Sequence, residues 1–213
     1  MTDRLEKIFS IIPACEVFAD IGCDHGYMAN AMLARGKAKK VIIADISDKC
    51  LSKAEELLYP YIKSGRATSV VANGFKGVPK SDVGLVAGMG GEEICSILKS
   101  ADILPNALVL QPMKNTDKVR LCLMDLGYKI EKDYLFKSAN KFYDLILAVR
   151  GKDALTEQEI EFGRDNVLNK SQDFLEFISQ KLIRLDGILK SQALSQDDRQ
   201  KMLNLKEKLQ KYV

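Results

Sequence analysis

The chain has 213 residues, 46% of them hydrophobic, five cysteines and a formal net charge of +3. This composition supports a full core, so we expect a soluble globular protein with one domain of ordinary size and an appendage. No apolar run reaches the roughly 18 residues of a membrane span, and the charges scattered over residues 1–12 disfavour a secretion signal. The odd cysteine count without a Cys-x-x-Cys pair predicts neither disulfides nor a metal site, which favours the cytoplasm.

The first predicted element is an amphipathic helix over residues 3–12, which Pro13 ends and which we expect to cover a sheet. Strands and helices then alternate. We predict strands over 17–21, 41–45, 67–72, 83–87 and 107–110, and helices over 29–34, 47–58, 92–99 and 115–126. Two last strands, 128–136 and 142–149, meet across the polar loop Lys137–Lys141 as a hairpin. The pattern predicts an α/β fold with a doubly wound parallel sheet that ends in an antiparallel hairpin.

After Gly151 the pattern becomes helical. Apolar residues recur at steps of three and four in two runs, on either side of a polar linker over 190–198: Leu175, Ile178, Leu182, Leu185 and Leu189, then Met202, Leu205, Leu209 and Tyr212. These heptads predict an antiparallel coiled-coil hairpin, with Lys181, Arg184, Lys206 and Lys208 outside. We therefore divide the chain into a domain over 1–151 and a helical domain over 152–213. The residues alone leave RNA binding and a structural or dimerising role equally open for the hairpin.

The stretch after the first strand, Asp20-Ile21-Gly22-Cys23-Asp24-His25-Gly26-Tyr27, indicates a ligand site at a strand–turn–helix junction. Gly22 and Gly26 would let the backbone pass close to a ligand. Asp20 and Asp24 would repel a phosphate but attract ammonium and ribose hydroxyl groups, as in S-adenosylmethionine. Asp45 ends the next strand roughly 20 residues later, where a ribose-binding carboxylate falls. The alternative is a glycine pair beside solvated acids.

Further motifs follow later strands: Asn73-Gly74-Phe75, Ala87-Gly88-Met89-Gly90-Gly91, Leu110-Gln111-Pro112 and Lys141-Phe142-Tyr143-Asp144. Together with the acidic glycine turn, they make the chain resemble the bacterial tRNA (adenine-22) N1-methyltransferases over nearly its whole length, helical hairpin included. The resemblance implies a Rossmann-like class I methyltransferase fold, S-adenosylmethionine as methyl donor, and methylation of N1 of an adenine at the D-arm corner of tRNA.

The chain departs from the family pattern at four positions. Asn73 stands where the family usually has an aspartate, and Asp45 where it has a glutamate-type acid; both changes are chemically mild. Met113 replaces an asparagine after Gln-Pro, and Arg164 replaces the proline of a Gly-Pro element. The last two changes bear on the base pocket and on the junction with the helical domain.

From these motifs we assign candidate residues to three roles and expect no metal. Asp20 and Asp24 are the catalytic candidates: one would hold the donor's ammonium, and the other would accept a proton from the adenine N6 amine as the ring becomes cationic. The predicted donor contacts are Asp20, Gly22, Cys23, Asp24, His25, Gly26, Asp45, Ile46, Asn73, Gly74, Gly88 and Met89. The predicted contacts to the target base are Gly90, Gly91, Gln111, Pro112 and Tyr143.

Several of these residues have structural alternatives. For His25 we favour a helix-start role or a donor contact over a general base, because adenine N1 brings no proton to remove. Gly88 to Gly91 would otherwise form a close-packed turn, and Tyr143 would otherwise belong to the core. The expected partner is tRNA, with no membrane, and the expected state is a monomer. The alternatives in function are methylation of another RNA position or of a small molecule, and a non-catalytic module that binds the donor or RNA.

Overall fold

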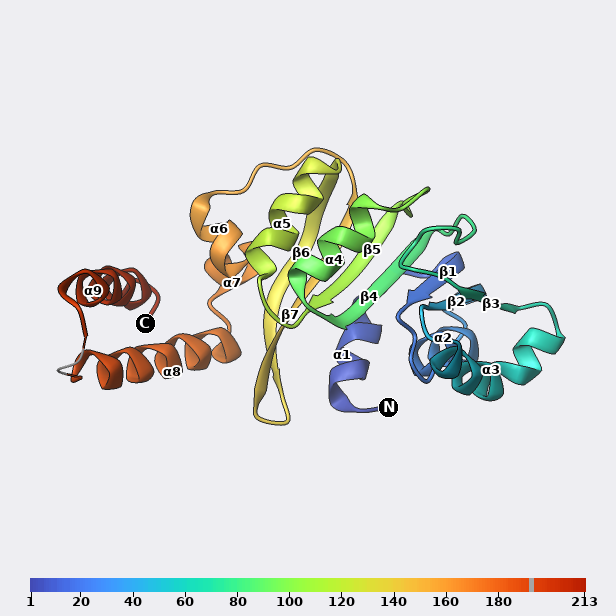
Figure 1. Cartoon of the computed structure of the whole chain (residues 1–213), viewed down its shortest axis with the longest axis horizontal. Coiled ribbons are helices and arrows are strands. Elements are labelled where there is room, and N and C mark those ends of the chain that lie inside the picture. The colour runs from blue at the N-terminus through green and yellow to red at the C-terminus, as the bar shows by residue number, and fades with distance from the viewer. Residues whose placement is uncertain (192–193) are drawn as a thin grey trace.

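The computed structural model, which describes residues 1–191 and 194–213, is built around one seven-stranded sheet in the order β3-β2-β1-β4-β5-β7-β6 (Figure 1). Strands β1 to β5 pair in parallel, whereas β7 runs antiparallel to β5 and β6 antiparallel to β7. This confirms the predicted parallel sheet that ends in an antiparallel hairpin. The bounds are β1 Cys15–Ile21, β2 Ala38–Asp45, β3 Ala67–Val71, β4 Val83–Met89, β5 Ala107–Pro112, β6 Tyr128–Ser138 and β7 Lys141–Arg150.

Helices cover both faces of the sheet. One face packs against α1 (Asp3–Ile11), α2 (Tyr27–Ala34) and α3 (Asp48–Lys63), and the other against α4 (Gly91–Lys99) and α5 (Thr116–Asp125). The two faces arise because successive side chains of a strand point to opposite sides, so that Phe18 and Ala19 enter different cores. None of the helices within the described ranges is both long and apolar enough to cross a membrane.

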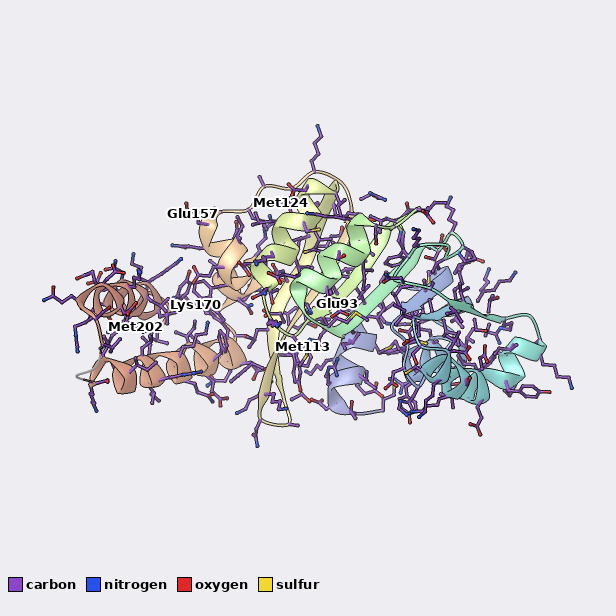
Figure 2. The ribbon with its side chains drawn as sticks, in the orientation of Figure 1. Glu93, Met113, Met124, Glu157, Lys170 and Met202 are labelled. Carbon is purple, nitrogen blue, oxygen red and sulfur yellow. The ribbon has the colours of Figure 1, made fainter. Side chains whose placement is uncertain are left out.

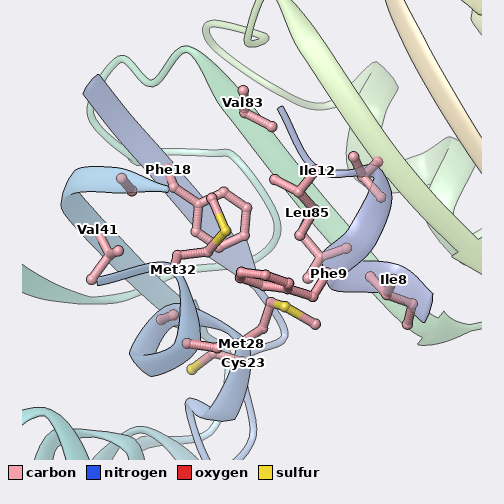
Figure 3. Close-up of a cluster of buried hydrophobic side chains, with 14 of the residues drawn as sticks. Ile8, Phe9, Ile12, Phe18, Cys23, Met28, Met32, Val41, Val83 and Leu85 are labelled. Atoms are coloured by element: carbon pink, nitrogen blue, oxygen red, sulfur yellow. The ribbon is translucent and has the colours of Figure 1, made fainter. Parts of the chain in front are cut away.

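Helix α1 belongs to the core and is not a loose cover. Figure 3 shows Phe9 reaching from α1 toward Met28 of α2 and Leu85 of β4, while Phe18 lies beside Met32. Ile8 of α1 is fully buried as well. Each such side chain stabilises the fold by roughly 1.5–3 kcal/mol. The start of α1 is therefore held firmly near the carboxyl edge of the sheet.

The turn between β6 and β7 is shorter than predicted. Only Ala139 and Asn140 join the strands, and both have positive φ angles, of 46° and 62°. Two such residues match the twist of the flanking strands. The predicted loop Lys137–Lys141 is thus wrong at both ends, because Lys137 and Lys141 pair within the hairpin.

The outer edge of β6 is covered by side chains from the segment that follows the sheet. This segment contains two short helices that the sequence reasoning missed, α6 (Glu157–Phe162) and α7 (Arg164–Asn169). An uncovered edge strand would offer its N–H groups to another chain. Here the N–H groups of Ile130, Asp133, Leu135 and Lys137 donate to Asp153, Asp165, Asn166 and Asp173 at 2.8, 2.8, 2.9 and 3.0 Å.

A buried ion pair ties the same segment to the sheet. The Arg120 side chain of α5 is 0% exposed and that of Asp133 in β6 is 1% exposed. Arg120 donates from Nε and Nη2 to the two Asp133 oxygens at 2.8 and 2.9 Å. Its Nη1 donates to the backbone oxygen of Ile160 in α6 at 3.0 Å. One guanidinium therefore joins α5, β6 and α6.

The C-terminal helices α8 (Gln172–Leu189) and α9 (Gln196–Gln210) fold back on each other at one end of the molecule (Figure 1). Arg199 donates to the Leu189 oxygen at 2.8 Å, and at the other end Tyr212 packs on Phe174, with ring centroids 5.6 Å apart. The antiparallel hairpin is confirmed, although residues 192–193 of the predicted linker lie outside the described residues.

The predicted apolar seam is correct only in part. Ile178, Leu185 and Leu209 are buried, but Leu205 is 37% exposed, and Phe174 takes the core position expected for Leu175. The reason is that Phe162 of α6 joins the cluster through edge-on contacts with Phe174 and Tyr212. The hairpin therefore packs against α6 and not only on itself.

We expect Asp133→Asn to lower the free energy of unfolding by about 3–5 kcal/mol, because it leaves the buried Arg120 guanidinium without its main counter-charge. Urea unfolding measures this loss. Asp125→Asn is the control, since Asp125 is an exposed acid at the end of the same helix α5. Equal stabilities of the two variants would show that the buried pair does not hold this region together.

Candidate functional site

The candidate site is a hollow of about 500 Å³ at the carboxyl edge of the sheet. It lies where the strand order reverses between β1 and β4, which is the usual ligand position in open α/β sheets. Of the predicted residues, Asp20, Gly22, Cys23, Asp24, His25, Asp45, Gly88 and Met89 line it. Thr2, Arg4, Leu5, Tyr27, Met28, Leu85 and Ala87 line it too, and the sequence reasoning had not assigned them to a site.

The two glycines of the turn both have positive φ angles and lie close to other parts of the protein, and Gly22 also lines the hollow. Gly22 has a φ of 70°, and a Cβ there would lie 2.2 Å from Met89 Cε. Gly26 has a φ of 69°, and its Cβ would lie 2.9 Å from the Cβ of Ala54 in α3. The positive φ favours glycine at both positions, and at Gly26 the contact with Ala54 also leaves no room for a side chain, whereas at Gly22 the contacting atom is the flexible end of Met89. The glycines thus press the turn onto β4 and α3 and close the floor of the hollow.

Asp20 is a buried carboxylate in this floor. It is 5% exposed, and its Oδ2 accepts a hydrogen bond from the N–H of Ala29 at 3.2 Å. Burial raises the pKa of Asp20 to about 7; the Ala29 hydrogen bond opposes the shift and the Asp45 charge adds to it. No cation of the described residues forms an ion pair with Asp20. A cationic ligand group would supply the missing counter-charge.

Asp45 and Asp24 stand at the side of the hollow that faces β2. Asp45 Oδ1 accepts from the N–H of Ser47 at 2.9 Å and its Oδ2 from that of Asp24 at 3.4 Å, which fixes the carboxylate at the strand end. Asp24 has a φ of 45°, and its exposed side chain lies 2.7 Å from His25 Nδ1. The His25 ring stacks on Tyr27 with ring centroids 5.4 Å apart. His25 therefore has a structural partner on either side at the start of α2.

The glycines after β4 are packed closely. A Cβ on Gly91 would lie 2.3 Å from the Asn115 oxygen, and the Gly91 N–H donates to the Lys114 oxygen at 2.9 Å. Gly91 is thus held against the loop after β5, as the close-packed alternative predicted. Gly88 faces the hollow, and Gly90 caps α4 beside Lys114. Met113, labelled in Figure 2, is 51% exposed at the start of this loop.

Gln111 and Tyr143 come together through Arg4, a residue on α1 that the sequence reasoning passed over. Gln111 is fully buried, and its Oε1 accepts from Arg4 Nε at 2.9 Å and from Arg4 Nη2 at 2.6 Å. The same guanidinium lies over the Tyr143 ring, 5.4 Å from its centroid. Tyr143 also stacks on Phe136 in the core, as the structural alternative expected. The sequence signal for Arg4 was a cation on the first turn of a helix that packs on the sheet.

The remaining predicted residues do not line the hollow. Ile46 follows β2 and is 71% exposed. Asn73 follows β3 and is exposed, while the next residue, Gly74, packs against Ile97 of α4, where a Cβ would be 2.7 Å away. Pro112 is buried at the end of β5. Within the described residues, no cluster of His, Cys, Asp or Glu is arranged to hold a metal ion.

The family model described as a methyltransferase domain matches residues 1–146, which include the whole hollow. This chain belongs to that methyltransferase family. A Mycoplasma pneumoniae protein described as a candidate tRNA methyltransferase is 32% identical to this methyltransferase over 156 residues, 70% of this chain and 71% of the relative. The tRNA (adenine(22)-N(1))-methyltransferase of Bacillus subtilis is 25% identical over 97% of this chain and 92% of its own length.

Solved structures show the same fold over the full chain. A candidate tRNA (m1A22) methyltransferase of Streptococcus pneumoniae matches 100% of this chain and 99% of its own with a TM-score of 0.91 and 23% identity. The same protein in complex with S-adenosyl-L-methionine matches with a TM-score of 0.87 and 24% identity. The helical hairpin of this methyltransferase is therefore a shared part of the fold.

We expect Asp20→Asn to stabilise this methyltransferase at pH 8 by about 1–4 kcal/mol and at pH 5 by only about a third of that amount. With a pKa of about 7 in the folded protein and roughly 4 in the unfolded chain, Asp20 binds more protons when folded, so its contribution to stability falls as pH rises from 4 to 7. Urea unfolding at both pH values measures the effect. A difference that is the same at pH 5 and pH 8, as expected for the exposed control Asp125→Asn, would contradict it.

Proposed function

We propose that this methyltransferase transfers a methyl group from S-adenosylmethionine to N1 of an adenine in tRNA, and that the adenine is at position 22. The observation that carries the proposal is the hollow at the β1/β4 reversal, which gathers three carboxylates and no phosphate-binding glycine loop. The relative of Bacillus subtilis with that activity in its name aligns with nearly the whole chain, hairpin included. The small-molecule alternative is disfavoured, because the added helices form a hairpin at one end of the molecule and not a lid over the hollow (Figure 1).

The residues of the hollow fit the donor's chemistry. We assign the donor's ammonium to Asp20, which is buried and forms no ion pair with any cation of the described residues. Asp45 takes the ribose hydroxyls, since backbone N–H groups hold its two oxygens at the end of β2. The exposed Ile46 next to it offers an apolar surface for the adenine ring of the donor, and Asn73 an amide for its amine. When bound, the donor supplies the activated methyl group.

For methyl transfer the protein needs only to align adenine N1 with the methyl group and to stabilise the positive charge that develops on the adenine ring. Adenine N1 carries its own lone pair, so no base is needed to activate it, and the ring becomes cationic as the bond forms. We assign Asp24 to the target base, because its exposed carboxylate at the rim can accept the N6 proton of the cationic ring. We place the base against Gly88, Gly90 and Gln111, at the ends of β4 and β5.

The direct test uses labelled S-adenosylmethionine and unmodified tRNA, followed by nucleoside analysis and mapping of the modified position. N1-methyladenosine at position 22 supports the proposal. Methylation of another nucleoside or position would keep the enzyme class but overturn the target, and donor binding without transfer to any RNA would favour a non-catalytic module.

Substitutions of Asp20 and Asp24 should distinguish donor binding from methyl transfer. We expect Asp24→Asn to leave donor affinity within a few fold and to reduce single-turnover methylation by about 10- to 100-fold, because it removes a charge-assisted hydrogen bond in the transition state. Asp20→Asn should weaken both donor binding and turnover. Calorimetry and rapid quench measure the two effects, and equal losses of donor affinity in both variants would contradict this division of roles.

We propose that the helical hairpin binds tRNA through exposed lysine and arginine side chains that form no ion pair with nearby acids. Lys206 pairs with Asp186 at 2.7 Å, Lys208 pairs with Glu161, and Lys181 lies over the Phe177 ring, which leaves Arg184, Lys190 and Lys211 exposed. No ion pair of the described residues includes these three cations. Exposed cations position RNA through its phosphates without reading its sequence. With tRNA as substrate, we place the protein in the cytoplasm, as a monomer with a helical domain over 152–213.

Replacing Arg184, Lys190 and Lys211 with glutamine should weaken tRNA binding and lower its slope in log affinity against log salt by roughly 2. Donor affinity should stay unchanged. The control replaces Lys53, Lys63 and Lys80 with glutamine, which changes the net charge equally. Lys53 and Lys63 are exposed on α3, at the opposite end of the molecule from the hairpin (Figure 1), and Lys80 is exposed in the loop between β3 and β4. The same loss in both triple variants, or in neither, would assign the hairpin a structural role.

A further inference from the structure

The loop between β5 and α5 is fixed to its neighbours through its backbone. The Met113 N–H donates to the Met89 oxygen at 2.8 Å, and the Lys114 oxygen accepts from the Gly91 N–H at 2.9 Å. Met89 itself lines the hollow. The loop therefore has a set position at the ends of β4 and β5, where we place the target base.

This fixed loop presents an apolar side chain to solvent. Met113 is 51% exposed, and its Sδ accepts from Gln111 Nε2 at 3.5 Å. Gln111 is fully buried, and the same Nε2 donates to the Pro112 oxygen at 2.9 Å. The thioether thus lies against the end of the Gln111 side chain and keeps half of its own surface free. A thioether is a weak acceptor on an unbranched, adaptable side chain, so it can shift when a ligand arrives.

A single exposed apolar residue is ordinary on a protein surface. Met113 differs because its backbone is bonded to a strand that lines the hollow and its sulfur contacts a residue of the expected base subsite. An apolar side chain offers nothing to a phosphate or a ribose hydroxyl. It packs well on the face of an aromatic ring, and a methionine sulfur about 5 Å from the ring adds to that attraction.

We propose that Met113 packs on the face of the target adenine and holds the base at the rim of the hollow. This rests on the proposed function. Adenine must leave the RNA stack before its N1 can approach the methyl group, and a side chain that covers the extruded ring replaces part of the lost stacking. Met113 also stands where the family pattern has an asparagine, so this contact is a feature of this chain.

The test compares unmodified tRNA with the same tRNA carrying an abasic site in place of the target adenine. Fluorescence anisotropy measures both affinities for the full chain saturated with S-adenosylhomocysteine, which prevents methyl transfer. Met113→Ala should lower the ratio of the two affinities by about two- to tenfold relative to the unchanged protein, which is the strength of a methionine–ring contact. Its affinities for the abasic tRNA and for S-adenosylhomocysteine should stay within about twofold. Met113→Leu keeps the apolar volume and should retain most of the ratio.

Leu121→Ala is the matched control and should leave the ratio unchanged. Leu121 is 43% exposed on α5, the helix that follows the same loop, and it does not line the hollow. If Met113→Ala weakens both tRNAs equally, Met113 contacts another part of the RNA and the proposal is wrong. An unchanged ratio with unchanged affinities, or a loss of S-adenosylhomocysteine binding in place of a change in the ratio, would also overturn it. These outcomes leave the proposed function intact, whereas failure of the unchanged protein to methylate adenine in tRNA would overturn that function itself.

Discussion

The burial of one carboxylate, that of Asp20 at the end of β1, is the constraint on which the site depends. The glycine turn lies next to this group: Gly22 and Gly26 both have positive φ angles, Gly22 contacts Met89, and Gly26 contacts Ala54 so closely that a side chain would not fit. The cost appears as a pKa of about 7, since burial favours the protonated acid. A structure selected for stability alone would place a neutral side chain there. The acid is therefore best explained by a cation that binds beside it, which the proposed donor provides.

Helix α1 connects this constraint to the rest of the molecule. Its apolar face enters the core through Ile8 and Phe9, and this packing brings Arg4 to the opposite edge of the hollow from Asp45. The guanidinium then reaches Gln111 and Tyr143, which come from β5 and β7. Helix α1 thus joins the side of the site where the donor is expected to the side where the target adenine is expected. The first turn of α1 is as much a part of the site as the glycine turn.

The sequence predicted the parallel sheet with its antiparallel hairpin, the acidic turn and the position of Asp45, because each follows from local features: apolar runs, glycines and the acid that ends a strand. It did not predict Arg4, since that residue's role depends on a contact with Gln111, which lies far away in the sequence. It also did not show that Gly22 and Gly26 lie against Met89 and Ala54, because a glycine pair gives the same sequence pattern whether it faces a ligand or packed protein. Helices α6 and α7 were missed because each has only six residues, too few to show a helical period.

The covered edge of β6 explains how the helical hairpin relates to the site. The side chains that accept its N–H groups come from residues 153–173, and Arg120 adds a bond to α6, so the segment before α8 is anchored to the sheet along its length. Arg164, which departs from the family pattern, strengthens this junction through Asp153 and Glu159. The hairpin therefore starts from a fixed point on the sheet and not from a flexible linker. The exposed cations of the hairpin therefore have a fixed position relative to the hollow. In the proposed function, this arrangement would allow the hairpin to hold one part of a tRNA while a distant adenine is methylated in the hollow.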